Sequence, residues 1–194
     1  EEGVGAKKKI QGKGYSVEVE ILGEVPDREK VLSVPAEFTY KLIQNFKIYS
    51  CPNEDPHYDF NPTKHITFRD KNGEMHSIYQ IEKIIIVHDL IKMLKSSKGG
   101  SKYVFELVSK VFDKRGEVLP GELKRLKKYC QDEDFGAFFA FYNNSNRFYL
   151  LSDEVQHLSV PKPFTERKIP NVSRRGSKRE RLIHTYFDLS EFET

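Results

Sequence analysis

The chain has 194 residues, of which 38% are hydrophobic, 12% aromatic and 31% charged. This composition is typical of one folded domain and excludes a disordered segment, and 14 Phe and 10 Tyr supply a core without disulfide or metal support. The cysteines, Cys51 and Cys130, show no metal-binding or redox spacing, and no apolar run approaches the roughly 20 residues of a membrane span. We therefore expect a reducing, cytoplasmic location and no membrane segment. Because the sequence opens with Glu1 instead of Met, a piece of a longer protein with further domains or subunits is also expected.

Charge is distributed unevenly although the net value is only +3. Between Lys92 and Lys128 there are 11 basic and 4 acidic residues, a local +7, and between Lys162 and Arg181 there are 8 and 2, a local +6. Clustered Lys and Arg are expected on a surface that meets phosphates, although a solvated helix face is the favoured interpretation of the first cluster. The second cluster is rich in Arg, whose planar fork suits phosphates and base edges.

Residues 1–14 combine glycines and lysines without an apolar period, which predicts a flexible leader. Val17, Val19 and Ile21 then alternate with polar residues, as in a strand that is wet on one face and that Pro26 ends. Residues 36–46 have the spacing of a short amphipathic helix, and 47–51 follow as a short strand. Residues 51–64 contain three prolines and read as a loop.

The clearest local signal lies between 65 and 87. Asn72 and Gly73 separate two β-rich runs, and such a pair supplies the positive φ angles of a tight hairpin turn. The second run ends in consecutive isoleucines, which is typical of a strand buried on both faces.

Apolar residues three or four apart predict two or three helices in the middle of the chain, an insertion over about 89–132. Residues 136–151 then predict a second, strongly aromatic hairpin whose turn is 143–146, and 155–164 a further strand ended by prolines. Residues 165–181 read as a basic loop, and 182–192 as a closing strand with one helical turn. The predicted fold is α+β: after the leader (1–14), a single domain (15–194) whose mixed or antiparallel sheet curls into a barrel, with the helices packed on one side.

Catalytic signatures are weak throughout the sequence. Asp113, Glu122 and Lys124 trace a nuclease pattern that could hold Mg²⁺, but the Glu and Lys fall in a predicted helix. Arg179 and His184 have a spacing similar to that of HEPN ribonucleases, an all-helical family. Cys51, His57 and His65 fit no usual zinc spacing, and no phosphate-binding loop or G-x-S-x-G occurs. We predict no catalytic residue, cofactor or metal.

Aromatic and basic residues remain as candidates for binding. Aromatic rings beside Asn and Arg can stack a nucleic-acid base and satisfy its edge, although a well-packed hairpin gives the same pattern. The predicted base contacts flank the Asn-rich turn: Tyr142, Asn144, Arg147 and Tyr149. The predicted phosphate contacts lie in the basic loop: Arg174, Arg175, Lys178, Arg179 and Arg181.

The run HITFRDKNGEMHSIYQIEKIIIV resembles the strand pair of PUA-like barrels of the EVE/YTH type, and RFYLLSDEVQHLSVPKPF resembles a later strand of such modules. The ending HTYFDLSEF is similar to that of related domains attached to restriction and defence proteins. Residues 65–88 and 147–192 are covered in this way. The resemblance implies a nucleic-acid-binding module that in several relatives takes a modified or flipped base, although this chain lacks the Trp that often lines such cages.

Three hypotheses therefore stand. The first is a noncatalytic PUA-like module of a larger restriction or phage-defence protein, with DNA as the expected ligand and RNA as the alternative. The second is a metal-dependent nuclease domain, and the third a protein–protein interaction domain that uses the segment between Lys92 and Lys128.

Overall fold

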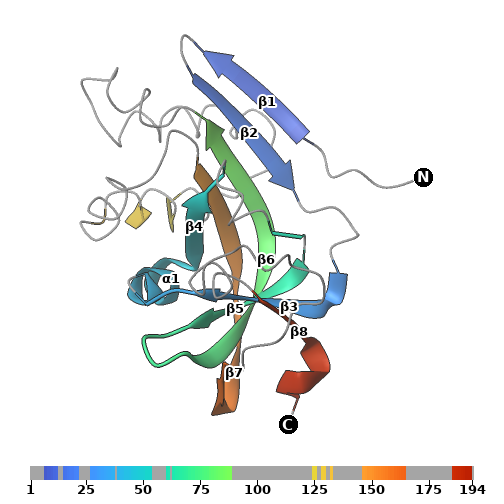
Figure 1. Cartoon of the computed structure of the whole chain (residues 1–194). Coiled ribbons are helices and arrows are strands. Elements are labelled where there is room, and N and C mark those ends of the chain that lie inside the picture. The colour runs from blue at the N-terminus through green and yellow to red at the C-terminus, as the bar shows by residue number, and fades with distance from the viewer. Residues whose placement is uncertain are drawn as a thin grey trace, which may run out of the picture.

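A computed structural model of the chain describes residues 7–12, 15–21, 27–37, 39–53, 60–61, 63–88, 124–125, 128–129, 132, 146–164 and 185–193. These residues form a mixed sheet with the short α-helix α1 and a closing 3₁₀ turn (Figure 1). The elements are β1 (Lys7–Gly12), β2 (Tyr15–Ile21), β3 (Asp27–Pro35), α1 (Tyr40–Phe46), β4 (Ile48–Pro52), β5 (Thr63–Arg69), β6 (Glu74–His88), β7 (Asn146–Pro163), β8 (Thr185–Asp188) and η3 (Leu189–Phe192).

Strand β6 organises the sheet because it is long enough to pair with three others (Figure 1). Along one edge it pairs with β7, which in turn pairs with β4. Along the other edge its first half pairs with β5 and its second half with β2, which carries β1. Beyond β5 lie β3, in parallel, and then β8. The predicted burial of its isoleucine run is confirmed, since Ile84, Ile85 and Ile86 are all buried.

The predicted hairpin is confirmed, with a turn of a different kind from the one expected. The Gly73 amide donates to the Asp70 carbonyl (3.0 Å), and the Asp70 amide donates to the Glu74 carbonyl (3.0 Å). Gly73 has φ 77°, whereas Lys47 is the one non-glycine residue with positive φ among those described. The loop is therefore a three-residue connection that needs a left-handed backbone at Gly73 and not at Asn72.

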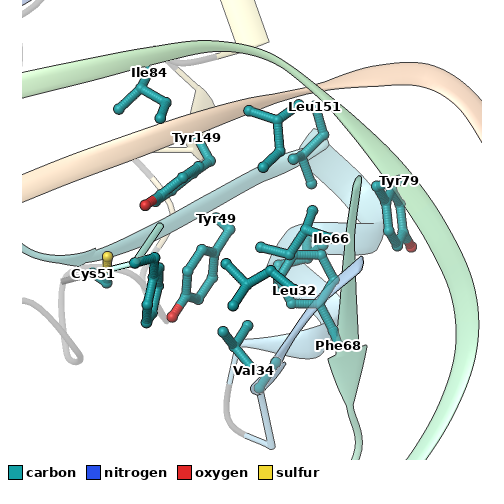
Figure 2. Close-up of a cluster of buried hydrophobic side chains, with 14 of the residues drawn as sticks. Leu32, Val34, Tyr49, Cys51, Ile66, Phe68, Tyr79, Ile84, Tyr149 and Leu151 are labelled. Carbon is teal, nitrogen blue, oxygen red and sulfur yellow. The ribbon is translucent and has the colours of Figure 1, made fainter. Parts of the chain in front are cut away.

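The main core lies inside the curl of the sheet, and strands from both of its edges contribute to it (Figure 2). The Tyr49 ring of β4 lies 5.3 Å from the Phe68 ring of β5 and 5.7 Å from the Tyr149 ring of β7, measured between centroids. Tyr79 and Ile81 of β6 and Ile43 of α1 complete this packing. Contacts between side chains, and not backbone hydrogen bonds, thus connect β4 to β5 across the interior.

A second, smaller core lies on the other face of β3 and β5. It gathers Val31, Met75, Ile78, Phe187 and Phe192, with Leu158, Phe164 and Leu189 packed against it. The predicted closing strand and helical turn are confirmed as β8 and η3, and these elements supply the two phenylalanines numbered 187 and 192. The Lys162 ammonium lies 4.8 Å from the Phe192 ring centroid and donates to the Glu191 carbonyl (2.6 Å).

Two expectations about the sheet are corrected. The barrel does not close: the path runs from β1 to β8, and within the described ranges no ladder joins β8 to β4. Residues 146–163 form one continuous strand where two were expected, because β6 is long enough to pair with all of it. The predicted first arm of the aromatic hairpin lies outside the described residues.

Two strands were not expected. Lys7–Gly12, in the predicted leader, pair with β2 as β1. Strand β3 was missed because its buried residues, 31–34, are consecutive and lack the two-residue alternation of a half-buried strand. The short helix at 40–46 and the strand after it are confirmed.

Little of the predicted helical insertion is described. Lys124, Arg125, Lys128 and Tyr129 are helical, in the part predicted as the last helix. Tyr129 is buried, and its hydroxyl lies 2.7 Å from that of Ser50. The Arg125 guanidinium donates to the Leu151 carbonyl (3.1 Å) and to Asp153 (3.0 Å). This segment therefore packs on the outside of β4 and β7.

None of the described helices has the length and apolar character needed to cross a membrane.

Candidate nucleic-acid interface

Arg147 lies at the start of β7, where that strand sits between β4 and β6. Its Cα pairs with Cys51 on one side and Ile86 on the other. The half-buried side chain donates from Nε to Oδ1 of Asn53 (3.1 Å) and from Nη1 to the hydroxyl of Tyr149 (3.4 Å). Both acceptors are uncharged oxygens, and the two bonds orient the guanidinium plane. We call Arg147, Asn53 and Tyr149 the Arg147 site.

Tyr149 supports the arginine from within the main core. Its side chain is 2% exposed, and its ring lies 5.7 Å from that of Tyr49 and 6.3 Å from that of Phe60. Burial raises the pKa of the Tyr149 hydroxyl far above its usual value, the nearby Cys51 raises it further, and Arg147 acts in the opposite direction. The phenol therefore stays neutral and accepts a hydrogen bond. Because both neighbours cover its ring, Tyr149 presents no face on which a base could stack in this structure.

A second contact ties β8 to the same end of the main core. The Asn61 amide donates to the Tyr186 hydroxyl (2.8 Å), and the half-buried Tyr186 packs against the main core. Burial is the main cause of the raised pKa of the Tyr149 hydroxyl, and Tyr186 adds a small contribution in the same direction. Tyr186 was missed as a candidate, although its place in the alternating HTYF run indicated a side chain on the face opposite Phe187.

The other predicted contacts were Tyr142, Asn144, Arg174, Arg175, Lys178, Arg179 and Arg181, and all of them lie outside the described residues. Of the first basic cluster, Lys124 and Lys128 are exposed and Arg125 is bound to Asp153. Lys162, which opens the second cluster, is engaged with Glu191. The structure therefore brings together two of the nine predicted residues, Arg147 and Tyr149.

The alternative catalytic sets find no assembly in the described part of the chain. Cys51 belongs to the main core, as do Ile66 and Phe68 of β5. His65 precedes Ile66 and therefore lies on the other face of β5, so Cys51 and His65 cannot share a metal ion. His57, Asp113, Glu122, Arg179 and His184 lie outside the described residues. Lys124 is exposed on its helical turn.

No protein-family model and no curated protein matches the chain. Among solved structures, the chain is similar to a mutant form of ZmASCH from Zymomonas mobilis, with 13% sequence identity over 72% of this chain and 77% of that one. The TM-score is 0.36, below the level at which a shared fold follows.

Proposed function

We propose that this chain is a noncatalytic nucleic-acid-binding module and that the Arg147 site contacts its ligand. The observation that carries the proposal is the guanidinium of Arg147, which Asn53 and Tyr149 hold at an end of the curled sheet. A guanidinium fixed in this way offers its donors in a set plane, the geometry that phosphate oxygens and base edges accept in pairs.

The distribution of charge supports the same ligand class. The basic segment from Lys162 to Arg181, with a local charge of +6, ends four residues before β8 begins. Strand β8 carries Tyr186, which packs against the same main core as Tyr149. In the sequence, the basic segment thus leads directly into a strand that contributes to the core beneath the Arg147 site. Its arginines remain the proposed phosphate contacts, and Tyr142 and Asn144 remain the proposed base contacts.

The proposed module has four further properties: it is related to PUA-like domains, it prefers DNA, it takes a modified or flipped base as its ligand, and it belongs to a larger restriction or defence protein. The pair of resembling segments, 65–88 and 147–192, supports the first of these, since they correspond to the hairpin β5–β6 and to the region from β7 to η3.

The test is a fluorescence-anisotropy titration with single- and double-stranded DNA and RNA at two salt concentrations. We expect salt-sensitive binding of the unmodified chain. For Arg147→Gln we expect weaker binding and a log–log salt slope smaller by about one unit, since one phosphate contact is lost. Arg125→Gln is the matched control, because that arginine is bound to Asp153 on the outside of β7.

Absence of binding to every nucleic acid at low salt would discard the proposed function. Binding that Arg147→Gln leaves unchanged would keep the function but move the contact away from the Arg147 site. A gel of the same samples with Mg²⁺ separates binding from cutting, and cleaved nucleic acid would replace the module with the nuclease alternative.

A further inference from the structure

Three potential metal ligands meet at the turn that joins β5 to β6, both of which are labelled in Figure 1. Nε2 of His76 lies 3.0 Å from Oδ2 of Asp70 and 3.9 Å from Oε2 of Glu74. One ligand atom from each of the three residues lies within 4.8 Å of the others. We call Asp70, Glu74 and His76 the hairpin triad.

The backbone of the hairpin produces this convergence. Glu74 and His76 are two residues apart on β6, so their side chains leave the same face of the strand. Asp70 closes β5 and faces them across the three-residue turn that Gly73 permits. A register irregularity between β5 and β6 at this end of the ladder accompanies the turn.

The Asp70 carboxylate is oriented by the turn as well. Its Oδ1 accepts hydrogen bonds from the amides of Asn72 (2.8 Å) and Glu74 (3.0 Å), which directs Oδ2 toward His76. In metal sites, a ligating carboxylate is often oriented by hydrogen bonds to its other oxygen, as these two backbone amides do for Asp70. The imidazole is oriented in turn by Tyr40 of α1, whose ring meets it edge-on at 6.2 Å.

The exposure of the triad suits an ion that enters from solvent. The side chains of Asp70, Glu74 and His76 are 20%, 42% and 34% exposed, so each is partly shielded while none is closed off. Two carboxylate oxygens and one imidazole nitrogen form a three-ligand set that leaves further coordination positions to water. The imidazole makes the set different from an acidic patch, because it favours Zn²⁺ and its neighbours in the first transition row over Mg²⁺ and Ca²⁺.

We propose that the hairpin triad binds one Zn²⁺ ion, with Asp70 Oδ2, Glu74 Oε2 and His76 Nε2 as ligands. The separations of 3.0 and 3.9 Å between the ligand atoms bracket the spacing that Zn–O and Zn–N bonds of about 2.0–2.2 Å require, so side-chain rotation suffices to close the site. The site is independent of the proposed nucleic-acid binding, which concerns the other end of β6.

The test uses Co²⁺ as a spectroscopic probe and Zn²⁺ as its competitor. We expect one equivalent of Co²⁺ to give visible absorption bands that Zn²⁺ abolishes, and calorimetry to give one Zn²⁺ per chain. His76→Gln and Glu74→Gln should each weaken binding about tenfold or more, since each removes one ligand. Both substitutions leave the Asp70 turn bonds intact, so the variants keep the hairpin.

His157→Gln is the matched control. His157 is a histidine of the neighbouring strand β7 that is hydrogen-bonded to Ser77 (3.0 Å) and is not one of the triad, so its loss should leave binding unchanged. Chemical shifts of the His76 ring should move on addition of Zn²⁺. The proposal is overturned if Co²⁺ gives no bands at millimolar concentration, or if both triad variants bind as the unmodified chain does. In that case the triad is a hydrogen-bonded cluster alone.

Discussion

The Arg147 site lies beside the last residues of β6 and the hairpin triad lies at the start of that strand, and the two polar assemblies are built in opposite ways. Arg147 donates its hydrogen bonds to Asn53, 94 positions away along the chain, and to a tyrosine buried in the main core. The hairpin triad comes from seven consecutive residues around one turn. The comparison teaches that the first site depends on the whole sheet, whereas the second depends on one local backbone conformation.

Removal of a core ring should show the dependence on the whole sheet most strongly. Phe68 is 1% exposed and contacts both Tyr49 and Tyr79, so Phe68→Ala leaves a cavity in the main core. We expect a loss of about 3–5 kcal/mol in the free energy of unfolding, measured by urea denaturation.

Val160→Ala is the control for this loss, because Val160 is 73% exposed, and its effect should stay within about 0.5 kcal/mol. If Phe68→Ala also lowered the free energy of unfolding by no more than about 0.5 kcal/mol, the packing of Phe68 against Tyr49 and Tyr79 would be looser than the ring contacts indicate.

A change confined to the turn should act on the hairpin triad and spare the Arg147 site. Gly73 has φ 77°, and a Cβ there would meet no atom within 4 Å, so strain of the left-handed backbone is the whole cost of Gly73→Ala. We expect a loss of about 1 kcal/mol of stability together with weaker Zn²⁺ binding. Nucleic-acid affinity should not change, and a parallel loss of both affinities would contradict the separation of the two sites.

The smallest expected effect is a pH dependence of the free energy of unfolding that arises from His65, on the face of β5 opposite the main core. Burial lowers the pKa of His65 below 6.5, the backbone hydrogen bond with Arg28 opposes that shift, and Lys64 adds to it. As the pH falls below about 6.5, the unfolded chain binds a proton that the folded chain resists, so the free energy of unfolding decreases. In His65→Gln, urea denaturation between pH 7.5 and 5 should show less of this decrease, and an identical profile would assign it to other groups.

Sequence patterns predicted the elements whose residues are close along the chain. The Asn-Gly turn, the buried isoleucine run of β6, the short helix at 40–46 and the closing strand with its helical turn are all present. In each case a short-range pattern determines the backbone: a residue that tolerates positive φ, a period of two, or a period near 3.6. The Asp70, Glu74 and His76 spacing was equally visible, but its importance emerged only when the turn placed Asp70 opposite the other two.

The same patterns could not reveal the arrangement of the sheet. Strand β3 lies between a parallel neighbour and an antiparallel one, and its run of buried residues has no alternation that marks a strand. The expected barrel did not close, because no local signal specifies whether two distant strand edges meet.

By itself, the sequence determined a strand-rich fold, the hairpin predicted between 65 and 87 and the concentration of positive charge near the C-terminus. The tertiary structure alone decided that Tyr149 faces the interior, that Asn53 holds Arg147, and that Tyr186 reaches Asn61 across 125 positions. The physical reason is that a local conformation is favoured by neighbouring residues, whereas contacts between distant segments exist only after the sheet has closed long loops around its core.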